Sequence, residues 1–423
     1  LPIAGEFAGQ KIADARPAIA QKLKDKGLLV KVDENYRHRV AVSYRGGGKI
    51  EPQILSQWFM KVTAIKDAAI KAVKSGEIKF TPKNLEKLYF HWLKNLHDWC
   101  ISRQLWWGHE IPVWYCVGTD KGRCLPACKE PIVSIEPPKQ CPHCGSSDLK
   151  PDGDVLDTWF SAGLWPFSTL GWPDEDAPDL KRYFPTNFLE TAPEIIFFWV
   201  ARMIILSEAL TGQVPFKQVY FHGVVLDEKG QKMSKSLGNV LEPVALIDKY
   251  GSDALRMSLL GGNSAGTPQR YSEQKILKYR NFVTKIWNAS RFVAEARAES
   301  PKSQVPNPKL FDHTEKKFFA KLTKLEGKNE KNFQNLKLSV ALEELYEFFW
   351  HDFADQFLEY EKTAIRDSGD TARADQAKSC LLSALKRQLV LLSDFAPFLV
   401  DTVSREILNP NFKHSEKRAK RHI

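Results

Sequence analysis

The sequence predicts an α/β region built on a parallel sheet, followed by an all-helical region. Three observations lead to this division. Residues 219–225 form a short, mostly apolar run, as expected for a strand buried on both faces of a parallel sheet. A helical pattern that begins at Glu194 precedes this run. From Lys275 onward, apolar residues recur at helical spacing to the end of the chain.

The composition is that of a globular protein with room for two or three domains. The chain has 423 residues, of which 43% are hydrophobic and 26% are charged. No apolar run approaches the roughly 18 to 20 residues of a membrane helix, and no signal segment opens the chain, so we expect a cytoplasmic protein without a membrane partner. The net charge of +10 suits a polyanionic partner, although a basic surface is often only a solvated one.

The segment after the apolar run has the composition of a phosphate-binding loop. Residues 230–238 combine two lysines, two serines and two glycines: Lys232, Lys235, Ser234, Ser236, Gly230 and Gly238. The lysines supply mobile positive charges, the serines supply hydroxyl donors, and the glycines let the backbone bend close to an anion. The segment lacks the spacing of a P-loop. Lysine and serine also fill ordinary solvated loops, so composition alone leaves that alternative open.

The amino-acid sequences of this loop and of five further segments resemble those of a known enzyme class. Lys-Met-Ser-Lys-Ser at 232–236, directly after a strand, resembles the signature loop of class I aminoacyl-tRNA synthetases. Five segments resemble the valyl-tRNA synthetases within this class: residues 98–108, 154–160, 165–173, 195–204 and 211–216. The isoleucyl enzymes share the lysine loop but are not expected to carry Ile-Ile-Phe-Phe-Trp or Trp-Trp-Gly in this wording. The resemblance runs over nearly the whole chain.

The resemblance implies a valine–tRNA ligase with a Rossmann-like catalytic fold, acting as a monomer on valine, ATP with Mg²⁺, and tRNA(Val). It implies two catalytic lysines, Lys232 and Lys235. It assigns ATP contacts to Lys232, Met233, Ser234, Lys235, Ser236, His222, Gly223 and Glu194. It places Trp159 and Trp199 in the walls of the amino-acid pocket.

Residues 191–194 depart from the wording of the family. The sequence has Thr-Ala-Pro-Glu where the family usually has glycine and aspartate. Glu194 can still accept hydrogen bonds from ribose hydroxyls, but Ala192 adds a methyl group where the backbone could need to approach the ligand. The ribose contact is therefore the least secure of the implied contacts.

The other half of the family's active site has no counterpart in this sequence. The chain opens on Leu1, and its one His-Gly pair, His222-Gly223, belongs to the strand before the lysine loop, so no H-x-G-H element is present. We therefore expect a piece of a longer protein that does not form an aminoacyl-adenylate by itself. Two alternatives stay open: an isoleucyl-tRNA synthetase, and a non-catalytic synthetase-like protein that binds tRNA.

The resemblance also divides the chain into domains. It assigns residues 1–50 to the C-terminal end of an inserted editing domain, 51–245 to the second half of the catalytic domain, 246–274 to a connector, and 275–423 to an anticodon-binding domain. From the residues themselves, we expect a helix over 11–23, a strand over 27–32, and a helix through Ala64 to Val73. Four tryptophans between 92 and 107 favour core packing, whereas Arg103 and Gln104 could face the tRNA end or the nucleotide.

Five of the seven cysteines lie close together, in an insertion at about 112–150. They are Cys116, Cys124, Cys128, Cys141 and Cys144. Turn-forming residues flank Cys141-Pro-His-Cys144, which favours a tetrahedral Zn²⁺ site. A redox pair and an unmetallated relic are the alternatives. Because the first three cysteines form no C-x-x-C, we expect one of them not to be a ligand.

The helical region contains two apolar stripes and a set of basic residues. One stripe comprises Leu342, Leu345, Phe349, Phe353, Phe357 and Tyr360, and the other comprises Leu381, Leu385, Leu389, Leu392 and Phe395. Both predict the core of a helical bundle. The expected tRNA-binding residues are Lys275, Lys278, Arg280, Lys285 and Arg291.

Overall fold

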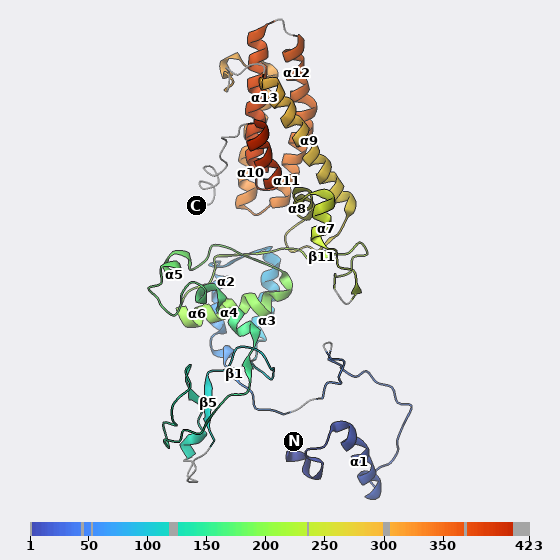
Figure 1. Cartoon of the computed structure of the whole chain (residues 1–423), viewed down its shortest axis with the longest axis vertical. Helices are drawn as coiled ribbons and strands as arrows, with labels where there is room; N and C mark the ends of the chain where they lie inside the picture. The colour runs from blue at the N-terminus through green and yellow to red at the C-terminus, as the bar shows by residue number, and fades with distance from the viewer. Residues whose placement is uncertain are drawn as a thin grey trace. The chain divides into compact units, whose positions relative to one another are not determined.

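The computed structural model describes residues 2–43, 46–51, 54–117, 126–234, 237–298, 305–367 and 370–408 (Figure 1). These residues belong to two compact units, Leu1–Gln57 and Trp58–Ile423. Lys235, Ser236 and Cys124 lie outside the described residues. Across the described part of the chain, we find no helix with the length and apolar character needed to cross a membrane.

The described residues of the first unit form little secondary structure. They contain the short helix η1 (Pro2–Phe7) and helix α1 (Ile12–Asp25), which confirms the helix expected over 11–23. The strand expected over 27–32 is wrong, because these residues are not paired in any sheet and Val30 is 98% exposed. A strand needs a neighbour to bond its backbone, and the described part of this unit offers one isolated bridge, between Val42 and Lys49.

A three-stranded parallel sheet forms the centre of the α/β region. Its order is β2 (Lys79–Thr81), β10 (Gln218–Phe221) and β9 (Leu189–Thr191). This confirms the predicted parallel sheet, although the central strand ends at Phe221 and not at residue 225. The chain then turns away, and β11 (Val225–Leu226) pairs in parallel with β12 (Gln269–Arg270).

Helices pack around this sheet and bury its side chains. They are η2 (Val62–Ala64), α2 (Lys66–Lys74), η3 (Lys83–Leu85), α3 (Glu86–Lys94), α4 (Thr158–Ser168), α5 (Pro178–Tyr183), η5 (Pro193–Ile195), the π-helical η6 (Ile196–Ala201) and α6 (Arg202–Thr211). Phe80 packs edge-to-face on both Tyr89 and Phe221, and all three are buried. Large rings of this kind bury much apolar area, so they fix the strands that carry the site.

Short antiparallel strands form the connections and the cysteine-rich insertion. β1 (Phe59–Met60) pairs with β3 (Trp99–Cys100), and β4 (Ser102–Arg103) pairs with β8 (Val155–Leu156). The insertion has the sheet order β6 (Ile132–Val133), β5 (Val113–Cys116) and β7 (Leu149–Pro151), with η4 (Pro126–Lys129) between β5 and β6.

The tryptophan-rich segment is not uniformly part of the core. Trp99 is buried, but Trp92 is 42% exposed, and Trp106 and Trp107 are almost fully exposed. The prediction of core packing is therefore wrong for Trp106 and Trp107. Composition alone misleads here, because both residues lie in the loop after β4 and outside the apolar periodicity of any helix or strand.

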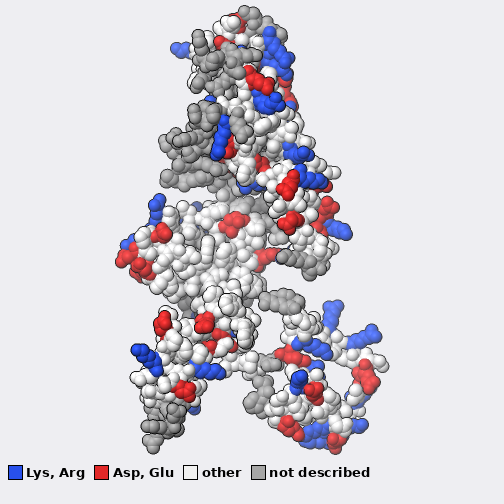
Figure 2. Space-filling view, viewed as in Figure 1, with Lys and Arg blue, Asp and Glu red and all other residues white. Residues whose placement is uncertain are grey.

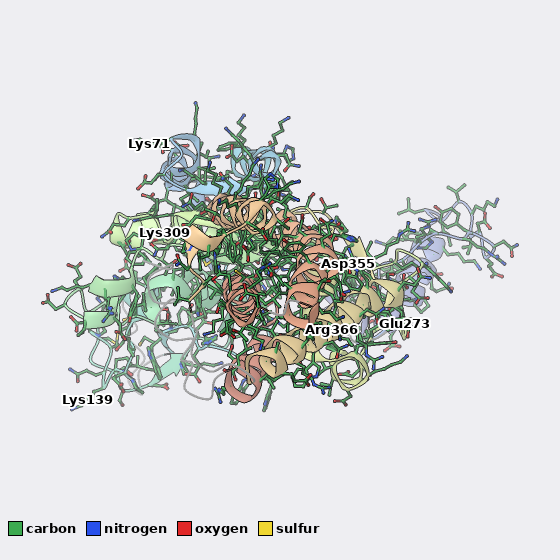
Figure 3. The ribbon with its side chains drawn as sticks, turned by 90° about the horizontal axis from the view of Figure 1, so that it is seen from above. Lys71, Lys139, Glu273, Lys309, Asp355 and Arg366 are labelled. Atoms are coloured by element: carbon green, nitrogen blue, oxygen red, sulfur yellow. The ribbon has the colours of Figure 1, made fainter. Side chains whose placement is uncertain are left out.

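Two helices follow the lysine loop. α7 (Pro243–Tyr250) and α8 (Ser252–Leu260) meet at Gly251, whose φ of +91° suits glycine. Glu273, labelled in Figure 3, is the first residue of helix α9 (Glu273–Ala298). It accepts a hydrogen bond of 2.8 Å from Lys249 Nζ, which connects α7 to α9. The buried carboxylate of Asp253 accepts a hydrogen bond from the backbone N–H of Leu399.

Helices form most of the described part of the chain after residue 272. They are α9 (Glu273–Ala298), η8 (Pro308–Leu310), α10 (His313–Gln334), α11 (Leu338–Glu347), the π-helical η9 (Phe348–Phe357), α12 (Leu358–Asp367), α13 (Thr371–Leu392), α14 (Pro397–Thr402) and the π-helical η10 (Val403–Leu408). Figure 1 shows α9, α12 and α13 running side by side. Both predicted stripes lie in one buried core, except that Tyr360 is 40% exposed.

Candidate active site and metal centre

The lysine loop is tied together by two residues to which the sequence analysis gave no role. After β11, Asp227 accepts hydrogen bonds from the backbone N–H of Gln231 (2.7 Å) and from the side-chain amide of Asn239 (2.9 Å). Asn239 in turn accepts a bond of 2.9 Å from the backbone N–H of Ser234. The bond from Asn239 lowers the pKa of Asp227, and the backbone N–H of Gln231 lowers it further. An aspartate before a glycine turn was the available sequence signal.

The structure brings Lys232 and Glu194 together. Lys232 Nζ lies 2.8 Å from each carboxylate oxygen of Glu194, which follows β9. Both side chains are more than half exposed, so this ion pair contributes at most about 1 kcal/mol and an anionic ligand can replace it. Ala192 has an ordinary extended backbone, with φ of −79°, so no backbone strain calls for glycine at this position. The ribose contact of Glu194 stays a prediction.

His222 and Gly223 follow the carboxyl end of β10, where parallel sheets bind their ligands. His222 Nε2 lies 3.5 Å from Glu190 Oε1, and His222 Nδ1 lies 3.0 Å from the carbonyl oxygen of Gly223. A Cβ on Gly223 would lie 1.7 Å from the carbonyl oxygen of Thr267, so only glycine fits here. A cavity of about 300 Å³ is lined by these residues and by Tyr220.

The two tryptophans predicted to line the amino-acid pocket, Trp159 and Trp199, lie on α4 and η6. Trp159, on α4, packs against Phe198 with ring centroids 5.6 Å apart. Trp199, on η6, donates a hydrogen bond of 3.1 Å to the carbonyl oxygen of Ala162 and packs against Trp165. Each ring therefore joins α4 to η6. Their contact with an amino acid stays a prediction.

Arg103 and Gln104 bond within the chain. Arg103 Nη2 donates to the buried Asp157 at 2.9 Å, and Gln104 Nε2 donates to Asp154 at 2.8 Å. Asp157 also accepts a bond of 3.2 Å from the indole N–H of Trp99. Burial lowers the pKa of the neighbouring Arg202 to about 10, and its guanidinium stacks 3.8 Å from the centroid of Trp99. These contacts hold β3 and β4 against the first residues of α4 and α6.

Four cysteines of the insertion converge. The sulfur atoms of Cys116, Cys128, Cys141 and Cys144 all lie within 4.8 Å of one another. Cys116 and Cys144 are 3.7 Å apart, and Cys128 and Cys141 are 4.0 Å apart, close to the roughly 3.8 Å that sulfur atoms adopt around tetrahedral zinc. Backbone N–H groups of Cys144 and His143 lower the pKa of Cys141 to about 7, which favours the metal-binding thiolate. The donor set fits Zn²⁺.

The five basic residues predicted to bind tRNA all lie on α9. Lys278 pairs with Glu343 at 3.0 Å, Lys285 with Asp355 at 2.9 Å, and Arg291 with Glu295 at 3.3 Å. Lys275 Nζ lies 3.4 Å from Gln269 Oε1, whereas Arg280 is exposed. Figure 2 shows acidic and basic side chains interspersed over the visible face of the helical region. The structure therefore does not bring these five residues together as a purely basic patch.

The family of the chain follows from its sequence. The model of tRNA synthetases class I (I, L, M and V) matches residues 19–270, and the model of the anticodon-binding domain of tRNA ligase matches residues 315–420. The chain therefore belongs to the class I tRNA synthetases. This result confirms the resemblance carried by the lysine loop.

Within the family, the chain is similar to individual valine–tRNA ligases. The valine–tRNA ligase of Clostridium tetani is 42% identical over 401 residues, which are 95% of this chain and 44% of that protein. The valine–tRNA ligase of Carboxydothermus hydrogenoformans is 43% identical over 400 residues, again 95% and 44%. The chain thus spans about 44% of the length of these curated relatives.

Solved structures share the fold. A Mycobacterium tuberculosis methionyl-tRNA synthetase in complex with methionyl-adenylate matches with a TM-score of 0.66 and 20% identity, over 86% of this chain and 65% of that chain. The LeuRS–tRNA–LeuAMS ternary complex of Agrobacterium radiobacter K84 matches with a TM-score of 0.59 and 19% identity, over 78% and 46%. Together with the family match, these structures confirm the catalytic fold and the helical domain.

Proposed function

We propose that the full-length protein is a valine–tRNA ligase and that this chain carries the second half of its nucleotide site and its anticodon-binding domain. The observation that carries this proposal is the identity of about 42% to valine–tRNA ligases over 95% of the chain. In the proposed reaction, the carboxylate of valine attacks the α-phosphate of ATP and displaces pyrophosphate. A ribose hydroxyl of tRNA(Val) then attacks the valyl carbonyl carbon and displaces AMP. No observation on the chain favours the isoleucyl alternative.

The chain's own residues would position the nucleotide and neutralise charge. Lys232, together with Lys235, would stabilise the charge that develops on the leaving pyrophosphate, a task shared with the Mg²⁺ that accompanies ATP. His222 and Gly223 would contact the nucleotide at the end of β10, and Glu194 would accept hydrogen bonds from its ribose. Placing these groups in advance reduces the entropy lost when the reactants meet.

An assay of ATP–pyrophosphate exchange tests whether this chain carries only one half of the adenylation site. The isolated chain should show no valine-dependent exchange, because its sequence contains no H-x-G-H element. The full-length protein should show robust exchange under the same conditions. Exchange by the isolated chain would contradict the assignment of this chain to one half of the site, whereas its absence from both proteins would favour the non-catalytic alternative.

The cysteine cluster would hold one Zn²⁺ that stabilises the insertion. Cys116, Cys128, Cys141 and Cys144 supply four thiolates in a closed arrangement, as in structural zinc sites. The sheet formed by β5, β6 and β7 is small, so a metal would supply stability that its few apolar side chains cannot.

We further propose that tRNA contacts a stripe of lysines on α10, in addition to the basic residues of α9. The stripe comprises Lys317, Lys321, Lys324, Lys328 and Lys331. Their spacing of four and three residues places them on one face of the helix, and all five are exposed. Lys321 pairs with Asp352 and Lys328 with Glu344. Within the described residues, the other three have no acidic partner, so they are available for phosphate groups.

Replacing Lys324 and Lys331 by alanine should weaken the binding of the chain to a tRNA(Val) transcript. The slope of log affinity against log salt should decrease by about 2, because two phosphate contacts are lost. The matched control is the double replacement of Lys71 and Lys74 on α2, which are also exposed. Filter binding at several salt concentrations measures both slopes. An unchanged slope in the α10 variant would exclude this stripe.

A further inference from the structure

The helical bundle contains a buried charged cluster that the proposed function does not use. Glu315 from α10, Glu361 from α12 and Cys380 from α13 are each no more than 1% exposed. One carboxylate oxygen from each glutamate and the thiol sulfur lie within 4.8 Å of one another. Arg373, in the first turn of α13, reaches the same place. The cluster therefore joins three helices through groups that normally remain in water.

The cluster holds fewer positive than negative groups if both glutamates are ionised. Arg373 Nη2 lies 3.0 Å from Glu361 Oε2, and Arg373 Nη1 lies 3.2 Å from Glu315 Oε1. The same guanidinium lies 3.5 Å from the carboxylate of Asp312. One permanent positive charge thus serves two fully buried carboxyl groups and a third that is partly exposed. A buried charge without full compensation is costly, and neutralisation is the usual outcome.

A second observation indicates where the proton would be. Glu361 Oε1 is buried and has no hydrogen-bond partner among the described residues, whereas Oε2 is held by Arg373. Both carboxylate oxygens of Glu315 accept hydrogen bonds. Oε1 accepts from Arg373 and from the Cys380 thiol at 3.4 Å, and Oε2 accepts from the backbone N–H of Asp312. Glu361 is therefore the carboxyl group whose ionised form is least stabilised.

We propose that Glu315 and Glu361 together hold one proton in the folded bundle, and that loss of this proton loosens the contact between α10, α12 and α13. The proton neutralises one carboxyl group, and Arg373 neutralises the other. When both carboxyl groups ionise, an uncompensated negative charge is left in the core of the bundle. The cluster thus makes the local stability of the bundle depend on pH.

The other groups that face the cluster do not replace Glu361 in this role. Asp312, before α10, is partly exposed and accepts a hydrogen bond from Tyr360 of α12. Burial raises the pKa of the Cys380 thiol on α13, and the nearby Glu315 raises it further, so Cys380 stays a neutral donor. Gln376 of α13 donates to the carbonyl oxygen of Asn307 and has no charge.

The sign of the pH dependence follows from the pKa of Glu361. Burial raises this pKa from 4.5 to about 8, although Arg373 acts in the opposite direction. Between these two values the folded chain binds more protons than the unfolded chain, so stability decreases as pH rises. Below the window both states are protonated, and above it both are ionised, so the contribution of this group becomes constant.

Hydrogen exchange of the whole chain, measured by mass spectrometry between about pH 5 and about pH 7.5, tests the proposal. After correction for the intrinsic pH dependence of exchange, protection of peptides from α10, α12 and α13 should decrease by up to about tenfold per pH unit. Peptides from α6 serve as an internal reference, because α6 lies outside the cluster. A pH-independent protection of the bundle peptides in the wild-type chain would overturn the proposal.

Two variants separate a shared proton from a general effect of pH. Glu361→Gln keeps the shape of the side chain but cannot ionise, so the pH slope should disappear. The matched control is Glu359→Gln, because Glu359 lies on α12 but is exposed and pairs with Lys362. This control should keep the wild-type slope. A Glu361→Gln chain that keeps the slope would contradict the proposal.

Glu315→Gln provides a second test if the first variant does not fold. It leaves Arg373 to serve Glu361 alone, so the pH slope should again disappear even if the loss of the Glu315 cap lowers protection at every pH. The readout is the slope and not the absolute protection. Retention of the slope in this variant would show that the two carboxyl groups do not share a proton.

Discussion

Replacing Lys232 by alanine in the full-length protein should lower valine-dependent pyrophosphate exchange by about two to three orders of magnitude. The reason is that the ammonium group of Lys232 would stabilise charge that is greatest in the transition state. The loss should therefore fall mainly on kcat, with a smaller change in the KM for ATP. Steady-state exchange kinetics at several ATP concentrations separate the two effects. An effect confined to KM would contradict this role.

The fold should tolerate the same replacement. Lys232 is more than half exposed, and its ion pair with Glu194 is a surface pair, so the free energy of unfolding should change by less than about 1 kcal/mol. Lys229→Ala is the matched control, because Lys229 lies three residues away on the same turn and outside the proposed set of ATP contacts. The control should keep close to wild-type exchange. Equal losses in both variants would indicate a general effect of charge on the loop.

Removal of zinc should have a similarly large effect, on the stability of the cysteine-rich insertion. The purified chain should contain about one Zn²⁺, and Cys141→Ser should lose it, because three thiolates and a hydroxyl form a much weaker site. Structural zinc sites contribute a binding free energy on the order of 10 kcal/mol, so the insertion should unfold locally without the metal. Elemental analysis measures the metal, and limited proteolysis within residues 112–150 measures the local unfolding.

Cys100→Ser is the control for the zinc prediction. Cys100 lies on β3, outside the four-sulfur cluster, so this variant should keep its metal and its resistance to proteolysis. A wild-type chain that contains no zinc after purification without chelators would favour the unmetallated relic. A stoichiometric zinc that survives Cys141→Ser would indicate a different set of ligands.

Much of the fold could be predicted because periodicity reports burial. Val219 and Phe221 of β10 and the two stripes of the bundle, apart from Tyr360, lie in the core, since one face of each element has to be removed from water. The strand predicted to be buried on both faces is fully buried on one face only, because Gln218 and Tyr220 are partly exposed. The strand expected over 27–32 failed because local sequence cannot supply a neighbouring strand. The prediction of core packing was wrong for Trp106 and Trp107. A large ring has much apolar area that could be buried, but its size does not tell whether the residue lies in a loop or in a packed element.

The site could be predicted in part, where its residues lie close in sequence. The turn-flanked pair Cys141 and Cys144 indicated a metal site with three further candidate cysteines, and the structure places two of these, Cys116 and Cys128, beside the pair. The pairing of Lys232 with Glu194 joins residues 38 positions apart, which follow strands of two different sheets, and no short sequence pattern reports such a contact. The cluster around Glu361 was missed because its acidic and basic members come from three helices.

The most direct test of the account is the charging of tRNA(Val) by the full-length protein, measured side by side with valine and with isoleucine. The account predicts valyl-tRNA at a rate well above any isoleucyl-tRNA, and it predicts a steep decrease of this rate in the Lys232→Ala variant. Preferential charging with isoleucine would show that the amino acid was assigned wrongly. Binding of tRNA(Val) without charging by either amino acid would contradict the proposed ligase and leave a protein that only binds tRNA.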